Sequence, residues 1–489
     1  MLILLVRRIL GITIWSGPAD SIYAVQQSRE PLDIRLGMGS TLAAFVAASG
    51  GGSVGQYGPL VHFGATITEV LLKYIRIKID RRVFIACGVA GAISAGFNAP
   101  IAGVLFAHEA LLRRISIGAI APIAVTSIVA YAANQAFFNI EPTFSVPDMP
   151  IELQPLIPFL VMTAIMSAAS AMAYMAAIRK GRELATRSQW SMPKLITSCV
   201  LVVGCVGVVL PDVTGLGLAQ VNQMIDAQFT LGMLVILLAA KIFVTAYCLN
   251  AGFFGGVFGP ALFVGAATGA IAAYLAIMMG LSPHLSYALP VAAIAAVGGA
   301  VIGAPLAVIM IVIELTGSYA YGLSAMLCVI LCSVLTLRLF GLSYFDRQLL
   351  DRGIDLRLGQ EHVELSLTPV SEIDGSDFVR LPHSASLEEA RHALSDALAT
   401  EAYVCDDAGS LMGKINVHSL ARASSLAAAL DPHPTVLEAD ASLSAAMTTA
   451  STFVGESIPV VDQGKLVGAL SEGDIFNKVL QIQESLRQQ

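Results

Sequence analysis

The chain carries the same broken-helix pattern twice. Residues 55–59 read Gly-Gln-Tyr-Gly-Pro and residues 256–260 read Gly-Val-Phe-Gly-Pro, so the second turn follows the first by 201 positions. An apolar stretch follows each turn. Repetition at this distance indicates two related halves, and a hydrophobic segment broken by Gly and Pro in both halves indicates a binding site at their junction.

A second duplicated feature supports the same division. Ala-Pro occurs at residues 99–100 and again at 304–305, and a glutamate follows each proline by nine residues, at Glu109 and Glu314. We expect both to be structural carboxylates that accept hydrogen bonds from backbone N–H groups at a helix end, since a buried carboxylate needs such partners.

The composition predicts a membrane protein with a polar tail. Hydrophobic residues make up 56% of the chain and charged residues 13%, against about 25% charged in an average soluble protein. Several apolar runs are long enough to cross a bilayer: 117–133, 155–178, 195–210, 230–249 and 320–337. We therefore predict an all-α, multi-pass membrane unit over residues 1–356, with a first repeat at about 1–140 and a second at about 150–345.

The first repeat is expected to be shorter than the second. Two long apolar stretches, 155–178 and 195–210, precede the turn of the second repeat, and the first repeat has no room for their counterparts. We expect the first two helices of the first repeat to be missing and residues 1–14 to be the tail of a shortened helix. Either the start codon is misplaced or the protein is a reduced variant of its family.

Charge and cysteine spacing exclude other classes. The net charge of −7 and the pI near 5.6 argue against a nucleic-acid partner. The seven cysteines show no metal-ligand or disulfide spacing. We expect no metal, no catalytic constellation and no enzymatic activity.

The duplicated turn suits an anion. Glycine lets the backbone come close to a ligand, and proline is favoured at the first position of a helix. The first N–H groups of that helix have no intrahelical partners and lie at the positive end of its dipole. Two such ends could hold a desolvated anion without a buried Lys or Arg, whose charge would bind it too tightly for release.

These residues resemble the CLC family of chloride channels and chloride/proton exchangers. Residues 55–59 match its Gly-Lys/Arg-Glu-Gly-Pro signature and residues 256–260 its Gly-x-Phe-x-Pro signature. Ser16-Gly17 is similar to the centre of Gly-Ser-Gly-Ile-Pro, although the flanking residues differ, and Tyr344 matches the anion-binding tyrosine of the last helix. The resemblance implies an inverted repeat of broken helices, a homodimer and one anion pathway per subunit.

The same resemblance implies the anion ligands. They would be the hydroxyls of Ser16 and Tyr344 and the N–H groups of Val257 and Phe258, because hydroxyls and amides donate to an anion without adding charge. The remaining predicted site residues are Gly17, Gln56, Tyr57 and Gly58. The alternatives are that Ser16 is a helix N-cap and Tyr344 an interfacial aromatic residue.

Departures from the family pattern bear on mechanism. Tyr57 stands where the family has a gating glutamate, and a phenol with a pKa near 10 does not cycle a proton at neutral pH. Ala110 stands where exchangers have a second proton-relay glutamate. Gln56 replaces a basic residue and weakens the positive field at the mouth. His62 and His108 are the groups near these positions that titrate near neutral pH. The alternative for Tyr57 is that it only fills space.

The polar tail, residues 357–489, resembles a pair of CBS modules at about 366–422 and 430–485. Residues 457–475 predict strand, turn, strand and helix start. By the resemblance, Ser471 and Asp474 would bind the ribose of an adenine nucleotide such as ATP or AMP, while the first module has Asn416 and Ser419 instead. The alternative is a dimerisation module without ligand.

The sequence thus predicts passive, proton-uncoupled conduction of chloride or a similar monovalent anion through a cell membrane. Three alternative functions stay open. These are a chloride/proton exchanger using His62 or His108, a carrier of another anion such as bicarbonate or nitrate, and a non-conducting scaffold that senses nucleotide. The expected location is a bacterial inner membrane, in contact with lipid, with the tail in the cytoplasm.

Overall fold

The structure is a computed structural model that describes residues 2–27, 31–75, 79–138, 144, 146–147 and 151–487. It contains two compact units, Met1–Gly353 and Ile354–Gln489. The division falls three residues before the predicted boundary.

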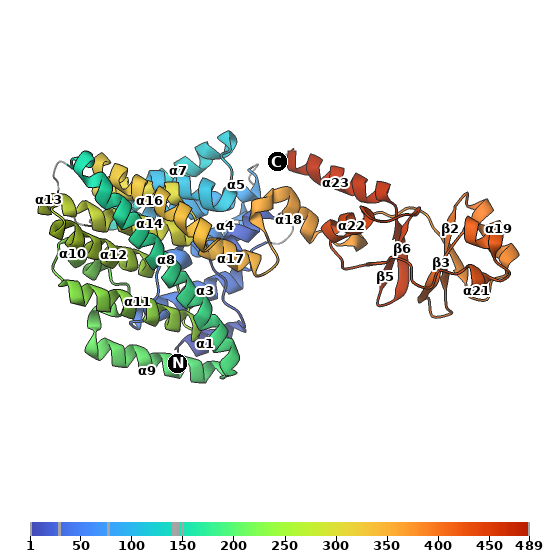
Figure 1. Cartoon of the computed structure of the whole chain (residues 1–489), viewed down its shortest axis with the longest axis horizontal. Coiled ribbons are helices and arrows are strands. Elements are labelled where there is room, and N and C mark those ends of the chain that lie inside the picture. Colours follow the sequence, from blue (N-terminus) through green and yellow to red (C-terminus); the bar gives the residue numbers. More distant parts are fainter. Residues whose placement is uncertain are drawn as a thin grey trace. The chain divides into compact units, whose positions relative to one another are not determined.

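Helices make up the first unit (Figure 1). Those of the first repeat are α1 (Leu2–Leu10), α2 (Pro18–Gln26), α3 (Ile34–Ser49), α4 (Tyr57–Tyr74), α5 (Arg81–Phe97), α6 (Pro100–Phe106), the π-helix η1 (Ala107–Leu112) and α7 (Ile117–Phe138). Asn98, in the left-handed conformation at φ 57°, ends α5, and Pro100 then starts α6.

The second repeat has more helices ahead of its Gly-Pro turn. Its elements are α8 (Leu153–Ser188), α9 (Met192–Val209), the 3₁₀ turn η2 (Pro211–Val213), α10 (Leu218–Ile225), α11 (Leu231–Asn250), α12 (Phe258–Met278), α13 (Pro283–Ser286), α14 (Ala288–Ile302), α15 (Pro305–Thr316), α16 (Tyr319–Leu339) and α17 (Tyr344–Leu350). Each predicted apolar run lies, to within one residue, inside a helix, namely α7, α8, α9, α11 and α16.

The core of this unit is formed by α12 and α14, which pack on each other and on α8. Every residue of α14 is buried, and the glycines of α12 let the two backbones approach: a Cβ at Gly269 would lie 2.4 Å from the Cα of Pro290. Within the described residues, seven helices are long and apolar enough to cross a membrane. The unit is therefore a multi-pass membrane fold, as predicted.

The second unit contains two similar α/β modules. After η3 (Leu356–Leu358), α18 (Gly359–Leu367) and η4 (Val370–Glu372), the first module has β1 (Val379–Pro382), α19 (Leu387–Asp396), β2 (Glu401–Cys405), β3 (Leu411–Asn416), α20 (Val417–Arg422) and α21 (Leu426–Ala429). The second has β4 (Leu437–Glu438), α22 (Leu443–Ala450), β5 (Ile458–Asp462), β6 (Lys465–Leu470) and α23 (Glu472–Arg487). In both sheets the first strand is parallel to the second and the second antiparallel to the third. The predicted strand, turn, strand and helix start of residues 457–475 is confirmed.

Candidate anion-binding site

The two duplicated turns meet in space. The N–H of Gly55 donates to the carbonyl of Gly256 at 2.6 Å, and the N–H of Gly256 donates back to the carbonyl of Gly55 at 2.6 Å. A Cβ on Gly55 would lie 2.8 Å from the Gly256 oxygen, and one on Gly58 would lie 2.9 Å from the Gly256 Cα. Only glycine allows this approach, so the pattern seen twice in the sequence is a requirement of the repeat junction.

Tyr57 starts α4 and is 3% exposed. Its ring stacks on Phe97, with 3.8 Å between ring centroids, and meets the edge of Phe258 at 6.0 Å. Phe258 occupies the same position of the second turn and also contacts Phe97, at 5.5 Å. Tyr57 therefore belongs to a three-ring cluster at the junction, whereas its neighbour Gln56 is exposed.

A cavity of about 540 Å³ lies next to the junction. Three predicted site residues line it, namely Gly17, Val257 and Tyr344. The other predicted residues are not in its lining: Ser16, Gln56, Tyr57, Gly58 and Phe258. The structure thus divides the predicted set into a cavity group and a group around the aromatic cluster.

Open hydrogen-bond donors lie at the start of α12 and on α17. Among the described residues, the N–H groups of Val257 and Phe258 have no backbone acceptor. The Val257 carbonyl accepts a bond from the Tyr174 hydroxyl at 2.8 Å. The Tyr344 hydroxyl accepts from Gln348 Nε2 at 3.0 Å, so its own proton remains available to donate.

The backbone N–H groups of the two predicted ligand residues ahead of α2 donate hydrogen bonds within the protein. The N–H of Ser16 donates to the Ser40 hydroxyl at 2.9 Å, and Ser16 is 5% exposed. Gly17, rather than Ser16, is the N-cap of α2, and its N–H donates to the Asp20 carboxylate at 2.7 Å. The N-cap alternative for Ser16 is wrong, and an anion at Gly17 would compete with Asp20.

Arginines surround the cavity, which sequence reasoning did not assign to the site. The cationic lining residues are Arg7, Arg179, Arg182, Arg347 and Arg352. Two aspartates offset part of this charge: Asp20 pairs with Arg352 at 2.6 Å, and Asp351 lies 3.9 Å from Arg182. The remaining positive potential would attract anions into the cavity. Basic residues are grouped at 179–187 in the sequence, but their convergence with Arg7, Arg347 and Arg352 depends on the fold.

Glu109 and Glu314 each cap a helix of the other repeat. Glu109 accepts bonds from the N–H groups of Leu306 at 3.0 Å and Ala307 at 2.8 Å, at the start of α15. Glu314 accepts from Ile101 and Ala102, both at 2.8 Å, at the start of α6. This exchange is the geometry expected of structural carboxylates.

The candidate positions for proton transfer are buried. Ala110 is 3% exposed within η1 and has no titratable atom. His62 is 1% exposed, and its Nδ1 lies 2.7 Å from the Ser21 hydroxyl. His108 is 5% exposed, and its Nδ1 lies 3.2 Å from the Arg114 carbonyl. Among the described residues, Nε2 of both histidines lacks a partner.

In the tail, the predicted nucleotide residues bind to the chain itself. Asp474 accepts from the N–H and hydroxyl of Ser471, both at 2.8 Å, and from the Ser376 hydroxyl at 2.8 Å. Burial raises the pKa of Asp474, but the bonds from Ser471 and Ser376 outweigh burial and lower it. A cavity of about 430 Å³ adjoins these residues, between the 370–378 segment and strands β5 and β6. Ser376 was missed, because it lies 98 residues before Asp474 in the chain and meets it only in the fold.

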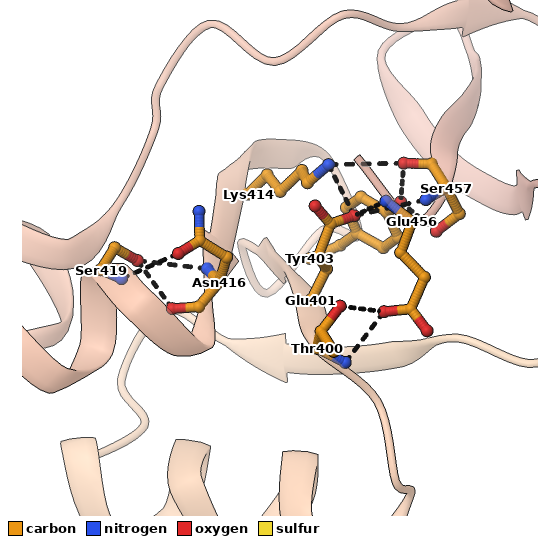
Figure 2. A network of polar contacts seen from close by, with 8 residues as sticks. All are labelled: Thr400, Glu401, Tyr403, Lys414, Asn416, Ser419, Glu456 and Ser457. Atoms are coloured by element: carbon orange, nitrogen blue, oxygen red, sulfur yellow. Dashed lines mark hydrogen bonds and ion pairs between the residues drawn. The ribbon is translucent and has the colours of Figure 1, made fainter. Parts of the chain in front are cut away.

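A polar network joins the two modules (Figure 2). Lys414 pairs with Glu401 at 2.7 Å, each 10% exposed, and Glu401 accepts from the Glu456 N–H at 2.9 Å. Glu456 in turn accepts from the N–H of Thr400 at 2.8 Å. Asn416 and Ser419 lie apart from this network and hydrogen-bond to each other. Asn416 is the N-cap of α20. The first module therefore uses these two residues to begin a helix.

Comparison with known proteins identifies the family. The family model for the voltage gated chloride channel matches residues 1–337, and the CBS domain model matches residues 427–481. The chain belongs to the voltage-gated chloride channel family. The CBS match covers only the second module, while the first repeats its strand order.

Relatives within this chloride channel family are distant. A putative chloride channel protein ClcB-like of Ralstonia nicotianae is 28% identical over 260 residues, or 51% of this chain and 60% of the relative. The H(+)/Cl(-) exchange transporter ClcA of Vibrio cholerae is 31% identical over 232 residues, or 45% of this chain and 49% of the relative. The chain spans about half the length of the curated relatives it matches.

Solved structures of chloride channel family members have the same fold. A slow cyanobacterial Cl-/H+ antiporter matches with a TM-score of 0.62 at 19% identity, over 69% of this chain and 80% of that one. A eukaryotic CLC transporter matches with a TM-score of 0.62 at 17% identity, over 97% and 87% of the two chains. The predicted inverted-repeat membrane fold with an α/β tail is confirmed.

Proposed function

We propose that the chain carries small monovalent anions, chloride first, across a cell membrane. One observation carries the proposal: Val257, whose N–H is open, and Tyr344 line the same arginine-lined cavity, and the open N–H of Phe258 follows directly in the chain at the repeat junction. Helix N-termini and hydroxyls stabilise an anion while leaving it free to move on.

Chloride/proton exchange is the mode that the names of the relatives favour, more than the passive conduction predicted first from the sequence. In this chain an exchanger needs proton carriers other than Tyr57 and Ala110. Asp20 lines the cavity, and its neighbour Ser21 contacts His62, which supports this path as the alternative.

Passive conduction is favoured by the residues at the two altered positions. The Tyr57 ring packs on Phe97 and stays neutral at physiological pH, and Ala110 has nothing to protonate. Neither position offers a carboxylate to couple a proton to the anion.

The deciding experiment is anion efflux from liposomes that contain the purified chain, with and without an imposed pH gradient. Chloride flux that is indifferent to the pH gradient supports passive conduction, and flux that drives protons uphill supports exchange. A Tyr57→Glu variant tests whether a carboxylate at this position restores or alters coupling. Flux of nitrate or bicarbonate without chloride flux would show another anion to be the substrate, and silence to all of them would contradict the proposal and favour a scaffold.

For the tail we propose a cytoplasmic location and a single adenine-nucleotide site at Ser471 and Asp474, in a homodimer of a bacterial inner membrane. The retained Ser471–Asp474 pair supports the site, because a ribose hydroxyl suits a carboxylate acceptor, and Ser376, which bonds to Asp474, lines the neighbouring cavity. Binding of ATP or AMP to the full chain, compared between wild type and Asp474→Ala, tests it.

A further inference from the structure

Lys241 lies in the middle of α11 and is fully buried. Its Nζ donates to the carbonyls of Val213 and Gly215, both at 2.9 Å, and lies 4.7 Å from the centre of the Phe263 ring. Among the described residues no carboxylate pairs with it. A lysine inside a membrane unit is costly, so its position calls for a functional reason.

The carbonyls that Lys241 binds belong to the segment between α9 and α10. Gly217, the N-cap of α10, has a left-handed φ of 76°. A Cβ added there would lie 2.7 Å from the Phe263 ring and 3.3 Å from the lysine Nζ. The segment is therefore packed directly against the amino group, which fixes its path.

This segment in turn holds the turn of the first repeat. The N–H of Gly215 donates to the carbonyl of Gly51 at 3.0 Å. One helical turn beyond Lys241, the hydroxyl of Thr245 lies 2.8 Å from that of Ser53. Residues 51–55 are thus held at three successive points by the second repeat, the last being the Gly55–Gly256 bridge.

Comparison of the two repeats shows that Lys241 takes the place of a serine. Lys241 lies 201 positions after Ser40, the same offset as the two turns. Ser40 accepts the N–H of Ser16, just ahead of α2, and Lys241 binds the carbonyls just ahead of α10. Each residue thus holds the segment before the matching helix, but the one in the second repeat carries a basic amino group.

We propose that Lys241 is a positioning residue of the anion pathway. It fixes the 51–55 turn through Gly215, and its charge, unpaired by any described carboxylate, raises the positive potential at the repeat junction where the anion binds. This inference rests on the proposed transport of anions and holds for either mode.

The test uses the full chain, purified and reconstituted. Lys241→Met keeps the length of the side chain and removes its charge and donors, whereas Lys241→Arg keeps both. Lys194→Met, at an exposed position of α9, is the matched control. Chloride affinity by calorimetry and chloride efflux are measured on samples with the same elution profile.

We expect Lys241→Met to weaken chloride binding and slow efflux by about tenfold or more, because two charge-assisted hydrogen bonds and a nearby charge are lost. Lys241→Arg should recover part of both, and Lys194→Met should match wild type.

Unchanged chloride affinity and efflux in a folded Lys241→Met protein would overturn the inference while leaving the proposed function intact. So would a loss of efflux that Lys241→Arg does not recover at all. If Lys241→Met fails to fold, Thr245→Val decides, because it removes only the Ser53 contact: a smaller loss of chloride affinity supports the inference, and no loss overturns it. A wild-type chain that binds no monovalent anion overturns the proposed function and this inference together.

Discussion

Both units of the chain are duplications, but their halves are joined by different chemistry. In the membrane unit the repeats are joined through backbone groups: the Gly55–Gly256 bridge and the glutamates that cap helices of the opposite repeat. In the tail the modules are joined by the Ser410–Lys465 backbone bridge and, in addition, by an ion pair, with Lys414 between Glu401 and the loop that precedes β5. In an apolar surrounding the backbone must be satisfied within the protein, whereas at the module interface of the tail the two largely buried charges of Lys414 and Glu401 must pair with each other.

The comparison predicts its largest effect at the swapped glutamates. Glu314→Ala leaves the N–H groups of Ile101 and Ala102 without acceptors, and Glu109→Ala does the same to Leu306 and Ala307. Each variant should lose about 2–6 kcal/mol of stability, from two unsatisfied donors at about 1–3 kcal/mol each. Thermal unfolding in detergent measures this. If one variant is as stable as wild type while the other unfolds, the two repeats are not equivalent at this contact.

The next effect concerns the aromatic cluster. Tyr57→Ala removes a ring stacked on Phe97 and should cost about 3 kcal/mol, within the range for deleting a buried aromatic side chain. Tyr57→Phe makes the position identical to Phe258 and should cost less than about 1 kcal/mol, since the ring is kept. Unfolding of both variants separates the ring from the hydroxyl. A large loss of stability in Tyr57→Phe would mean that the hydroxyl, and not the shared packing, distinguishes the first repeat.

Asp20 provides a smaller test at the cavity. Asp20→Asn removes a negative charge that accepts the Gly17 N–H and should tighten chloride binding by about two- to fivefold, the scale of a partly exposed ion pair. Calorimetric titration with chloride measures it. Asp351→Asn is the matched control, since Asp351 lines the same cavity without contacting Gly17. Weaker binding in Asp20→Asn would show that the aspartate positions the site instead of competing with the anion.

The tail should show a weak dependence on acid. Hydrogen bonds from Thr400 lower the pKa of Glu456 below its ordinary value of 4.5. The ionised carboxylate therefore stabilises the folded modules at pH values above 4.5, and this stabilisation is lost as the pH falls through the lower folded pKa. Unfolding of the tail at pH 7 and pH 3, compared between wild type and Glu456→Gln, measures it. Equal losses in both proteins would show that other carboxylates cause the acid sensitivity; Glu438→Gln, exposed on β4, is the control.

The smallest effect is expected at Ser376. Ser376→Ala frees part of the Asp474 carboxylate and should tighten nucleotide binding to the full chain by about two- to fivefold, because one net hydrogen bond no longer competes. Ser371 lines the same cavity without touching Asp474, so Ser371→Ala is the control. Weaker binding of ATP in Ser376→Ala would make the serine a ligand of the nucleotide.

Local patterns in the sequence predicted the parts of the fold that depend on local chemistry. The Gly-Pro turns, the apolar helices and the strand order of the second module all follow from neighbouring residues. The glutamates were placed at helix ends, but the exchange between repeats could not be read from spacing alone. The cavity lining was missed for the same reason: Arg7, Arg179 and Arg352 lie far apart in the chain and meet only after folding. The stacking of Tyr57 on Phe97 likewise depends on how α4 and α5 pack.

The exchanged glutamates also have a consequence for the order in which the protein is made. The N–H of Ile101 is bonded to a carboxylate 213 residues further along the chain. At synthesis rates of about 5–20 residues per second, the start of α6 is synthesised roughly 10–40 seconds before Glu314 is added. For that time the open end of α6 needs a temporary partner, in water, lipid headgroups or the insertion machinery. The first repeat therefore cannot complete this helix cap until the second repeat has been synthesised.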